Sequence, residues 1–344
     1  MTVKELAKKL GVSISTVSKA LNDSYEISEP TKVRVRKLAE RYNYKPNRLA
    51  VNLKSGKTRT IGIILPSILN NFFTTVLCGI EKVTNERNYN IITCISNESF
   101  EKEVTNTEIL SNGIIDGLIV AIAEETQIKK DFKHFEACIK EGHPVVMFDR
   151  ITSEIECDKV VVDDLNDAYL ATSHLIGMNC KKPALVSAID FLGVGQLRVK
   201  GFKKAVNEKF GSVDDELILR TSVEDLEERV NTLLTRHHPD GIFAVDEDAS
   251  LAIQKVAKMN GLHIPDDLAL IGYAGEKMAK NLTPALTTVN QNGVSIGESA
   301  ARILIDRLEH GGEGFVTKVI NTNIENRQSA ARKKGIQDQN NTNI

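Results

Sequence analysis

The sequence predicts a small all-α head that contains a helix-turn-helix, followed by a large α/β body of two lobes. Two patterns predict this fold class. The first sixty residues are basic and carry apolar residues at helical spacing, whereas from Thr60 onward short apolar runs alternate with amphipathic stretches. This second region, with about 270 residues, exceeds what one hydrophobic core normally serves, so we expect two lobes.

Composition is ordinary for a soluble globular protein, with 344 residues of which 41% are hydrophobic and 26% charged. No stretch approaches the ~20 apolar residues that span a bilayer, and the polar N-terminus has no apolar signal core. The five cysteines are scattered without a CxxC pair, which favours a reducing compartment over disulfides or a zinc site. We therefore expect a cytoplasmic protein with no metal and no cofactor.

The net charge of −2 hides a strong asymmetry. Residues 1–60 hold 14 Lys and Arg against 5 Asp and Glu, and the remainder holds 30 basic against 41 acidic residues. The head therefore carries +9 and the body −11. A basic head that also has phased apolar residues favours a folded nucleic-acid-binding module over a disordered tail.

Three helices are predicted in the head, and each begins at a hydroxyl residue that can cap it: Thr2, Ser13 and Ser28. Gly11 ends the first helix, where a left-handed residue is favourable. The residues expected to face inward are Val3, Leu6, Ala7 and Leu10 in the first helix, Val17, Ala20 and Leu21 in the second, and Val35, Leu38, Ala39 and Tyr42 in the third. Two short helices joined at a glycine form a helix-turn-helix.

Two segments of the head are longer and more specific than a helical hairpin requires. They are LAKKLGVSISTVSKALN at 6–22 and YKPNRLA at 44–50. Both resemble the DNA-binding head of the lactose-repressor/galactose-repressor (LacI/GalR) family, and the likeness extends over roughly 2–330. The resemblance implies a transcriptional regulator, most often a repressor, that binds a palindromic operator in double-stranded DNA as a homodimer and responds to a small metabolite.

By this resemblance, the second helix lies in the major groove, where base edges can be distinguished. Ile14, Ser15 and Lys19 are then the base-reading residues. Phosphate contacts are expected from Ser13, Thr16, Ser18 and Asn22, although Thr16 could equally cap the helix. Val17 is expected in the core.

The segment 47–54 is shorter than the ~12 residues that an isolated helix needs in water. In the family it is a hinge helix that forms on operator DNA. The residues that match its DNA contacts are Asn47, Arg48, Ala50, Leu53 and Lys54, with Leu53 as a wedge between bases, Ala50 beside it, and Arg48 and Lys54 near phosphates. The alternative is a simple linker.

The body shows no motif of an enzyme. Strands are predicted at 61–66, 90–95, 117–121, 144–148, 159–162, 183–187, 216–219, 241–245, 268–271 and 286–289, with a helix near 72–88. The sequence has no GxxxxGK[ST] loop, no GxGxxG after a likely strand, no GxSxG elbow and no HExxH. We therefore expect no catalytic residues.

By resemblance, the body is the family's periplasmic-binding-protein-like sensor domain with two Rossmann-like lobes. The implied domains are a head at 1–46, a hinge and linker at 47–59, an effector-binding and dimerisation body at 60–330 and a polar tail at 331–344. The first lobe covers about 60–161 and 291–322 and the second about 162–290 and 323–330. Effector is expected between the lobes, at the carboxyl ends of the strands.

The residues that match the family's effector site are Phe72, Phe73, Asp149, Arg150, Arg198, Asp246 and Glu276. Phe73 could equally be a core residue, and the charged residues could be structural partners, such as Asp149 with Arg150 or Arg198. Ala274 stands where many members have an Asp, and nearby Glu276 is its possible substitute. The resemblance implies a sugar or sugar derivative as effector; Ala274 weakens the case for a familiar neutral sugar, and Arg150 and Arg198 add a uronate or a phosphosugar as options.

Val76, Ile80 and Val83 are candidates for a dimer interface, although their spacing fits a core equally well. The tail lacks a leucine heptad, which favours a dimer over a tetramer. Three other functions stay open: a global regulator of the same family that docks on a phosphorylated partner protein, a solute-binding protein and an α/β enzyme.

Overall fold

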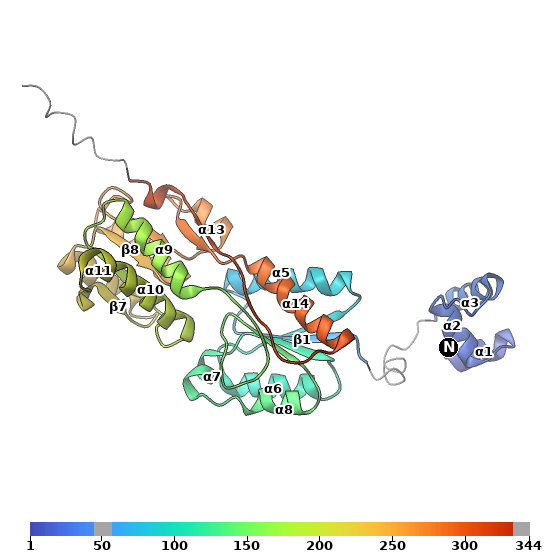
Figure 1. The fold of residues 1–344 in the computed structure, drawn as a ribbon. Helices are drawn as coiled ribbons and strands as arrows, with labels where there is room; N and C mark the ends of the chain where they lie inside the picture. The colour runs from blue at the N-terminus through green and yellow to red at the C-terminus, as the bar shows by residue number, and fades with distance from the viewer. Residues whose placement is uncertain (45–56, 333–344) are drawn as a thin grey trace, which may run out of the picture. The chain divides into compact units, whose positions relative to one another are not determined.

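The computed structural model describes residues 1–44 and 57–332, and these fall into two compact units divided between Thr58 and Arg59. Figure 1 shows the helical head and the α/β body. Of the helices in the described ranges, none is long and apolar enough to cross a lipid bilayer.

The head consists of helices α1 (Val3–Leu10), α2 (Ile14–Leu21) and α3 (Glu29–Arg41). The predicted capping box of α1 is present, since the Glu5 N–H donates to Thr2 Oγ1 at 3.3 Å and the Thr2 N–H donates to Glu5 Oε2 at 2.8 Å. Gly11 follows α1 with φ 67°, a left-handed conformation that glycine adopts without strain. The fully buried residues are Leu6, Ala7, Val17, Ala20, Val35 and Ala39.

The third helix begins at its N-cap Ser28 as predicted, but two details differ from the prediction. Ser28 occupies the N-cap position, but its side chain makes no capping hydrogen bond and instead lies 3.0 Å from the Thr31 hydroxyl. Tyr42 is exposed, because its hydroxyl accepts a hydrogen bond from Lys9 Nζ at 3.1 Å and so stays at the surface. Tyr44 packs against the core of the head.

The body contains two six-stranded sheets. The first has the order β11-β5-β4-β3-β1-β2 and the second β12-β10-β9-β8-β6-β7. The first comprises β1 (Thr60–Leu65), β2 (Asn90–Ile95), β3 (Gly117–Val120), β4 (Val145–Phe148), β5 (Asp158–Val161) and β11 (Thr317–Val319). The second comprises β6 (Pro183–Ser187), β7 (Ile218–Arg220), β8 (Gly241–Ala244), β9 (Ala269–Gly272), β10 (Thr287–Asn290) and β12 (Asn323–Glu325). All described pairings are parallel except that of β10 with β12.

Helices cover both faces of each sheet, as buried apolar strands require. One face of the first sheet packs against α5 (Asn71–Glu86) and α14 (Gly293–His310), and the other against α6 (Phe100–Ser111) and α8 (Lys133–Lys140). One face of the second sheet packs against α9 (Asp164–Gly177) and α10 (Gly193–Phe210), and the other against α11 (Leu226–His237), α12 (Glu247–Met259) and α13 (Glu276–Asn281). The short helix α7 (Glu124–Lys129) follows β3.

The chain passes between the two sheets three times, after β5, after β10 and between β11 and β12. The predicted strand at 216–219 is displaced, since Asp215–Leu217 form a 3₁₀ turn and β7 begins only at Ile218. This turn begins at Asp214, whose carboxylate accepts the Glu216 N–H at 3.0 Å.

Helices α5 and α14 lie side by side (Figure 1) and approach closely through glycines. A Cβ on Gly297 would lie 2.0 Å from the carbonyl oxygen of Val76, and one on Gly79 would lie 2.1 Å from that of Val294. The proposed interface residues Val76, Ile80 and Val83 are fully buried in the same packing. They are therefore core residues of one chain and cannot form a dimer interface.

Candidate DNA-reading helix and ligand cavity

Helix α2 divides its side chains between a core and an open face. Val17 and Ala20 are buried against α1 and α3, whereas Ile14 is 47% exposed and Ser15 also points to solvent. Ile14 is not among the described side chains that pack into or against the core of the head. Ile14 and Ser15, two of the three predicted base-reading residues, thus lie on the exposed face of the helix.

Two of the predicted phosphate contacts are engaged in capping α2. The Thr16 N–H donates to Ser13 Oγ at 3.0 Å, and the two side-chain oxygens are 2.9 Å apart. Ser18 is half-buried, and Asn22 is exposed at the C-cap of the helix. The capping alternative for Thr16 is therefore the arrangement that the structure shows in the absence of DNA.

Lys19 forms an ion pair with Glu26, a residue that the sequence analysis did not single out. Glu26 lies in the turn between α2 and α3, and both side chains are about half exposed. The carboxylate of Glu26 therefore competes with DNA for the ammonium group of Lys19. The predicted hinge residues Asn47, Arg48, Ala50, Leu53 and Lys54 lie outside the described residues.

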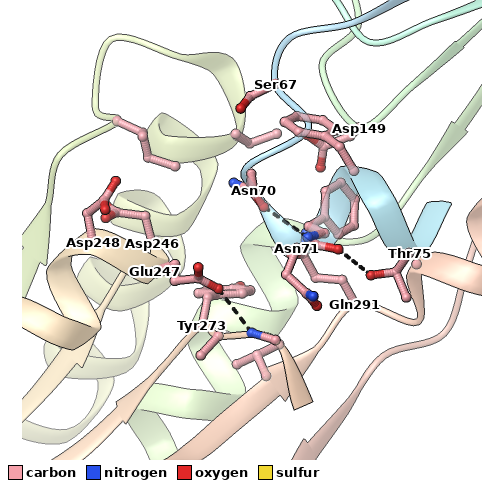
Figure 2. A pocket seen from close by; sticks show the side chains of 18 of the residues that line it. Ser67, Asn70, Asn71, Thr75, Asp149, Asp246, Glu247, Asp248, Tyr273 and Gln291 are labelled. Atoms are coloured by element: carbon pink, nitrogen blue, oxygen red, sulfur yellow. Dashed lines mark hydrogen bonds between the residues drawn. The ribbon is translucent and has the colours of Figure 1, made fainter. Parts of the chain in front are cut away.

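The body has a cavity of about 760 Å³ at the carboxyl ends of strands from both sheets. It is lined by residues that follow β1, β4, β6, β8, β9 and β10, as expected for a site in open parallel sheets. Figure 2 shows Asn70, Asp149, Asp246, Tyr273 and Gln291 around this space.

All seven predicted effector-site residues line this cavity. Phe73, however, is almost completely buried, and its ring centroid lies 6.3 Å from that of Phe148 in the core of the first sheet. Phe72, whose ring lies 5.4 Å from that of Phe73, is less buried. The core interpretation of Phe73 therefore fits its packing, and Phe72 is the more accessible ring.

The two arginines of the cavity are held by carboxylates that the sequence analysis missed. Arg150 Nη1 donates to Glu98 Oε2 at 2.6 Å. Arg198 Nε donates to Asp164 Oδ1 at 2.7 Å, its Nη1 donates to the Val245 carbonyl at 2.7 Å, and its guanidinium lies 3.9 Å from the centroid of the Tyr273 ring. Both arginines thus have structural partners other than Asp149.

Asp149 itself forms no ion pair within the described ranges. Burial and the charge of Asp164 raise the pKa of Asp149 to about 6, although Arg150 and Arg198 act in the opposite direction. Its φ of 57° is left-handed, a conformation that Asp and Asn tolerate better than most residues. The alternative in which Asp149 pairs with Arg150 or Arg198 is therefore not the arrangement that the structure shows.

Asp246 is the N-cap of α12. Its Oδ1 accepts the Ala249 N–H and its Oδ2 accepts the Ala188 N–H, both at 2.8 Å. The carboxylate thus ties the start of α12 to the end of β6. Glu276 is exposed at the edge of the cavity, and its ion pair with Lys280 already balances its charge.

Further polar residues of the cavity were not predicted. Glu247 accepts the Gly275 N–H at 3.0 Å, and Asn70 accepts the Phe72 N–H at 2.9 Å as the N-cap of α5 (Figure 2). Burial, together with the charge of Glu98, raises the pKa of Glu124. The positions of these residues directly after strand ends or at helix starts could have indicated them.

The hydroxyl of Tyr273 is buried and has no hydrogen-bond partner among the described residues. Its ring stands beneath Arg198 and at the wall of the cavity. Among the residues with described positions, no three His, Cys, Asp or Glu side chains are grouped to hold a metal ion.

Comparison with known proteins identifies both units. Residues 2–47 match the family "Bacterial regulatory proteins, lacI family", and residues 172–330 match a periplasmic binding protein-like domain. The HTH-type transcriptional regulator DegA of Bacillus subtilis is 30% identical over 292 residues, which are 84% of this chain and 86% of that protein. The HTH-type transcriptional repressor PurR of Vibrio atlanticus is 28% identical over 320 residues, with 90% and 92% covered.

Solved structures agree with this assignment. The lac repressor dimer bound to operator and the anti-inducer ONPF has the same fold, with a TM-score of 0.84, 18% identity and coverage of 96% of this chain and 99% of that chain. A LacI family regulator from Enterococcus faecium with bound ribose matches with a TM-score of 0.69 and 26% identity, covering 80% and 100%. The chain belongs to the lacI family of bacterial regulatory proteins and is a DNA-binding transcriptional regulator rather than an enzyme.

Proposed function

We propose that this regulator is a repressor that binds a palindromic operator as a homodimer and is switched by a small metabolite in the cavity of the body. The observation that carries the proposal is the cavity itself. It is large enough for a sugar, lies where strands of both sheets end, and belongs to the same chain as a reading helix with an open face.

In this proposal, Ile14, Ser15 and Lys19 read bases, while Ser13, Thr16, Ser18 and Asn22 contact phosphates. The exposure of Ile14 and Ser15 supports the first assignment. The hinge helix of residues 47–54 would form on DNA, with Leu53 as the wedge. One head alone binds weakly. Two heads held at half-site spacing bind tightly, because the second head then meets its half-site at a high effective concentration.

The switch rests on linkage between two sites. The proposed lobes are residues 60–161 with 291–322 and residues 162–290 with 323–330, and they would carry the two walls of the cavity. A ligand that prefers one arrangement of the lobes changes the spacing of the hinges. It then weakens or strengthens operator binding by the same factor by which operator changes ligand binding.

The class of ligand is a sugar or sugar derivative. Ribose and cellobiose are bound in solved structures of related fold, which supports this class. The charges argue against the options of a uronate or a phosphosugar, since Arg150 and Arg198 are both neutralised by carboxylates.

The test begins with selection of duplexes that the full-length protein retains at moderate salt. A palindromic consensus is expected, and sedimentation should give one dimer per site. Leu53→Ala should weaken binding to the palindrome by about tenfold or more and leave random duplex nearly unchanged, because the leucine inserts between bases only at the specific site. Lys19→Ala should relax base preference.

A second arm adds sugars to the operator complex. The proposal requires that at least one sugar changes operator affinity. Equal binding of the palindrome and of scrambled duplex, with and without sugars, would overturn it.

A further inference from the structure

The cavity carries a large excess of negative charge. Nine carboxylates line it, and the only cationic side chains among the described lining residues are Arg150 and Arg198. The nine are Glu98, Glu124, Asp149, Glu224, Asp246, Glu247, Asp248, Glu276 and Glu325. Such a surface attracts cations and repels anions before any specific contact forms.

Most of these carboxylates have partners within the protein. Glu98 pairs with Arg150, Glu276 with Lys280 and Glu325 with Arg327. Asp246 and Glu247 accept hydrogen bonds from backbone N–H groups. Because Arg198 is already paired with Asp164, which does not line the cavity, it contributes little net positive charge there.

Asp149 and Glu124 differ from the rest. Both are more than half-buried, both line the cavity, and neither carboxylate has a hydrogen bond or ion pair within the described ranges. Contacts of Glu98 bring the two residues to one part of the cavity, since its Oε2 accepts the Glu124 N–H at 2.9 Å and a hydrogen bond from Arg150, the residue after Asp149, at 2.6 Å. Arg150 forms its ion pair with Glu98, and Arg198 forms its ion pair with Asp164. Because buried carboxylates without partners are costly, a bound positive charge would stabilise Asp149 and Glu124.

Neutral polar groups line the cavity as well. The Tyr273 hydroxyl is buried without a partner, and the amides of Asn70, Asn71 and Gln291 surround the same space in Figure 2. Phe72 adds an accessible aromatic edge. These groups suit a ring with several hydroxyls, which can donate to and accept from them.

Resting on the proposed function of the cavity, we propose that its ligand is a cation: a hydroxylated primary amine of the amino-sugar class, whose ammonium group is bound by Asp149 and Glu124. A neutral sugar would cover these carboxylates without neutralising them. An anionic sugar would add to the repulsion. An ammonium group instead donates up to three charge-assisted hydrogen bonds and supplies the positive charge that Asp149 and Glu124 lack.

The test compares ligands that differ only in charge. Glucosamine, galactosamine and mannosamine are each titrated against the full-length protein beside the N-acetylated sugar and the parent hexose, with glucuronate as the anion. Calorimetry and thermal shift report binding. At least one amine is expected to bind about tenfold or more tightly than its acetylated and parent forms, the usual value of hydrogen bonds to a charged group.

Two results overturn the proposal. One is an acetylated, parent or anionic sugar that binds as tightly as the best amine. The other is the absence of saturable binding by any of the three amines at about 10 mM, a concentration at which even millimolar sites fill.

Variants locate the ammonium group. Glu124→Gln and Asp149→Asn should each weaken the amine about tenfold and reduce its advantage over the parent hexose. Glu125→Gln is the matched control, since Glu125 is the next residue, does not line the cavity and lies near Lys129 at the surface. An equal loss in Glu125→Gln would assign the preference to general charge and overturn the assigned subsite.

Operator binding separates this inference from the proposed function. If a neutral or anionic sugar binds and changes operator affinity, the metabolite switch stands and the cationic ligand falls. If an amine binds with the expected preference but operator affinity is unchanged, the cationic ligand stands and the metabolite switch falls.

Discussion

Asp149 should destabilise the folded body at neutral pH. Its pKa rises from an ordinary value of 3.8 to about 6, with burial as the main cause and the charge of Asp164 as the second. Each pKa unit corresponds to about 1.4 kcal/mol, so the full shift is worth about 3 kcal/mol. Since Asp149 is partly open to solvent in the cavity, screening leaves an expected cost of about 1–2 kcal/mol.

The sign follows from the direction of the shift. A raised pKa means that the folded state binds the proton more tightly than the unfolded state, so the penalty is absent below about pH 4. The penalty grows as the pH rises from about 4 to about 6, and it is nearly constant at higher pH. Asp149→Asn removes the charge, and Asn tolerates the left-handed φ of 57° at this position.

Calorimetric unfolding of the full-length protein tests this reasoning. Asp149→Asn should raise the Tm of the body by about 2–4 °C at pH 8, and the gain should shrink towards zero near pH 4. Asp266→Asn, a change at an exposed aspartate, is the matched control and should show no such pH dependence. A loss of stability at pH 8, or a difference that is the same at both pH values, would refute the argument.

Two further predictions concern the head and the helix packing. Glu26→Gln should raise affinity for operator and random duplex alike by about threefold in low-salt binding assays, because Lys19 loses its ion-pair partner; unchanged affinity would contradict this. Gly297→Ala should lower the free energy of unfolding in urea by about 1–3 kcal/mol, because its Cβ would lie 2.0 Å from the Val76 carbonyl oxygen. Gly177→Ala, where a Cβ meets open space, is the control and should lose nothing, so equal effects of the two changes would exclude the steric explanation.

The place of the ligand cavity could be predicted from the sequence because it follows from topology. Asp149 and Asp246 each come directly after an apolar run that forms a buried strand, and the carboxyl ends of parallel strands meet at one edge of a sheet. Arg198 was found only through the family resemblance, since it lies in the middle of α10 rather than at a strand end.

The partners of these charges could not be predicted in the same way. Glu98 meets Arg150 across 52 residues of chain, and Asp164 meets Arg198 across 34. No local spacing encodes such a contact, because it depends on where loops of different elements converge. The neutralisation of both arginines, which changes the class of ligand, therefore emerged only from the three-dimensional structure.

Helical spacing also left core and surface unresolved. The pattern of Val76, Ile80 and Val83 fits a core and an interface equally, and the fold decides because α14 packs on this face through Gly297. Tyr42 shows the reverse error. Its position predicts an inward side chain, yet the hydrogen bond from Lys9 holds its hydroxyl at the surface.

The charge of the cavity bears directly on how a ligand could move the lobes. Asp149 and Glu124 come from the first sheet, whereas Asp246 and Glu247 come from the second. Carboxylates facing one another across the same space repel, and the repulsion grows as the two walls approach. If the ligand is the proposed amine, its ammonium group would offset this repulsion, and its charge would favour an arrangement in which the two walls are closer. Under the proposed function, the carboxylate of Asp149 that is predicted to lower stability at neutral pH would also make closure depend on ligand, and by linkage the same free energy would change operator affinity.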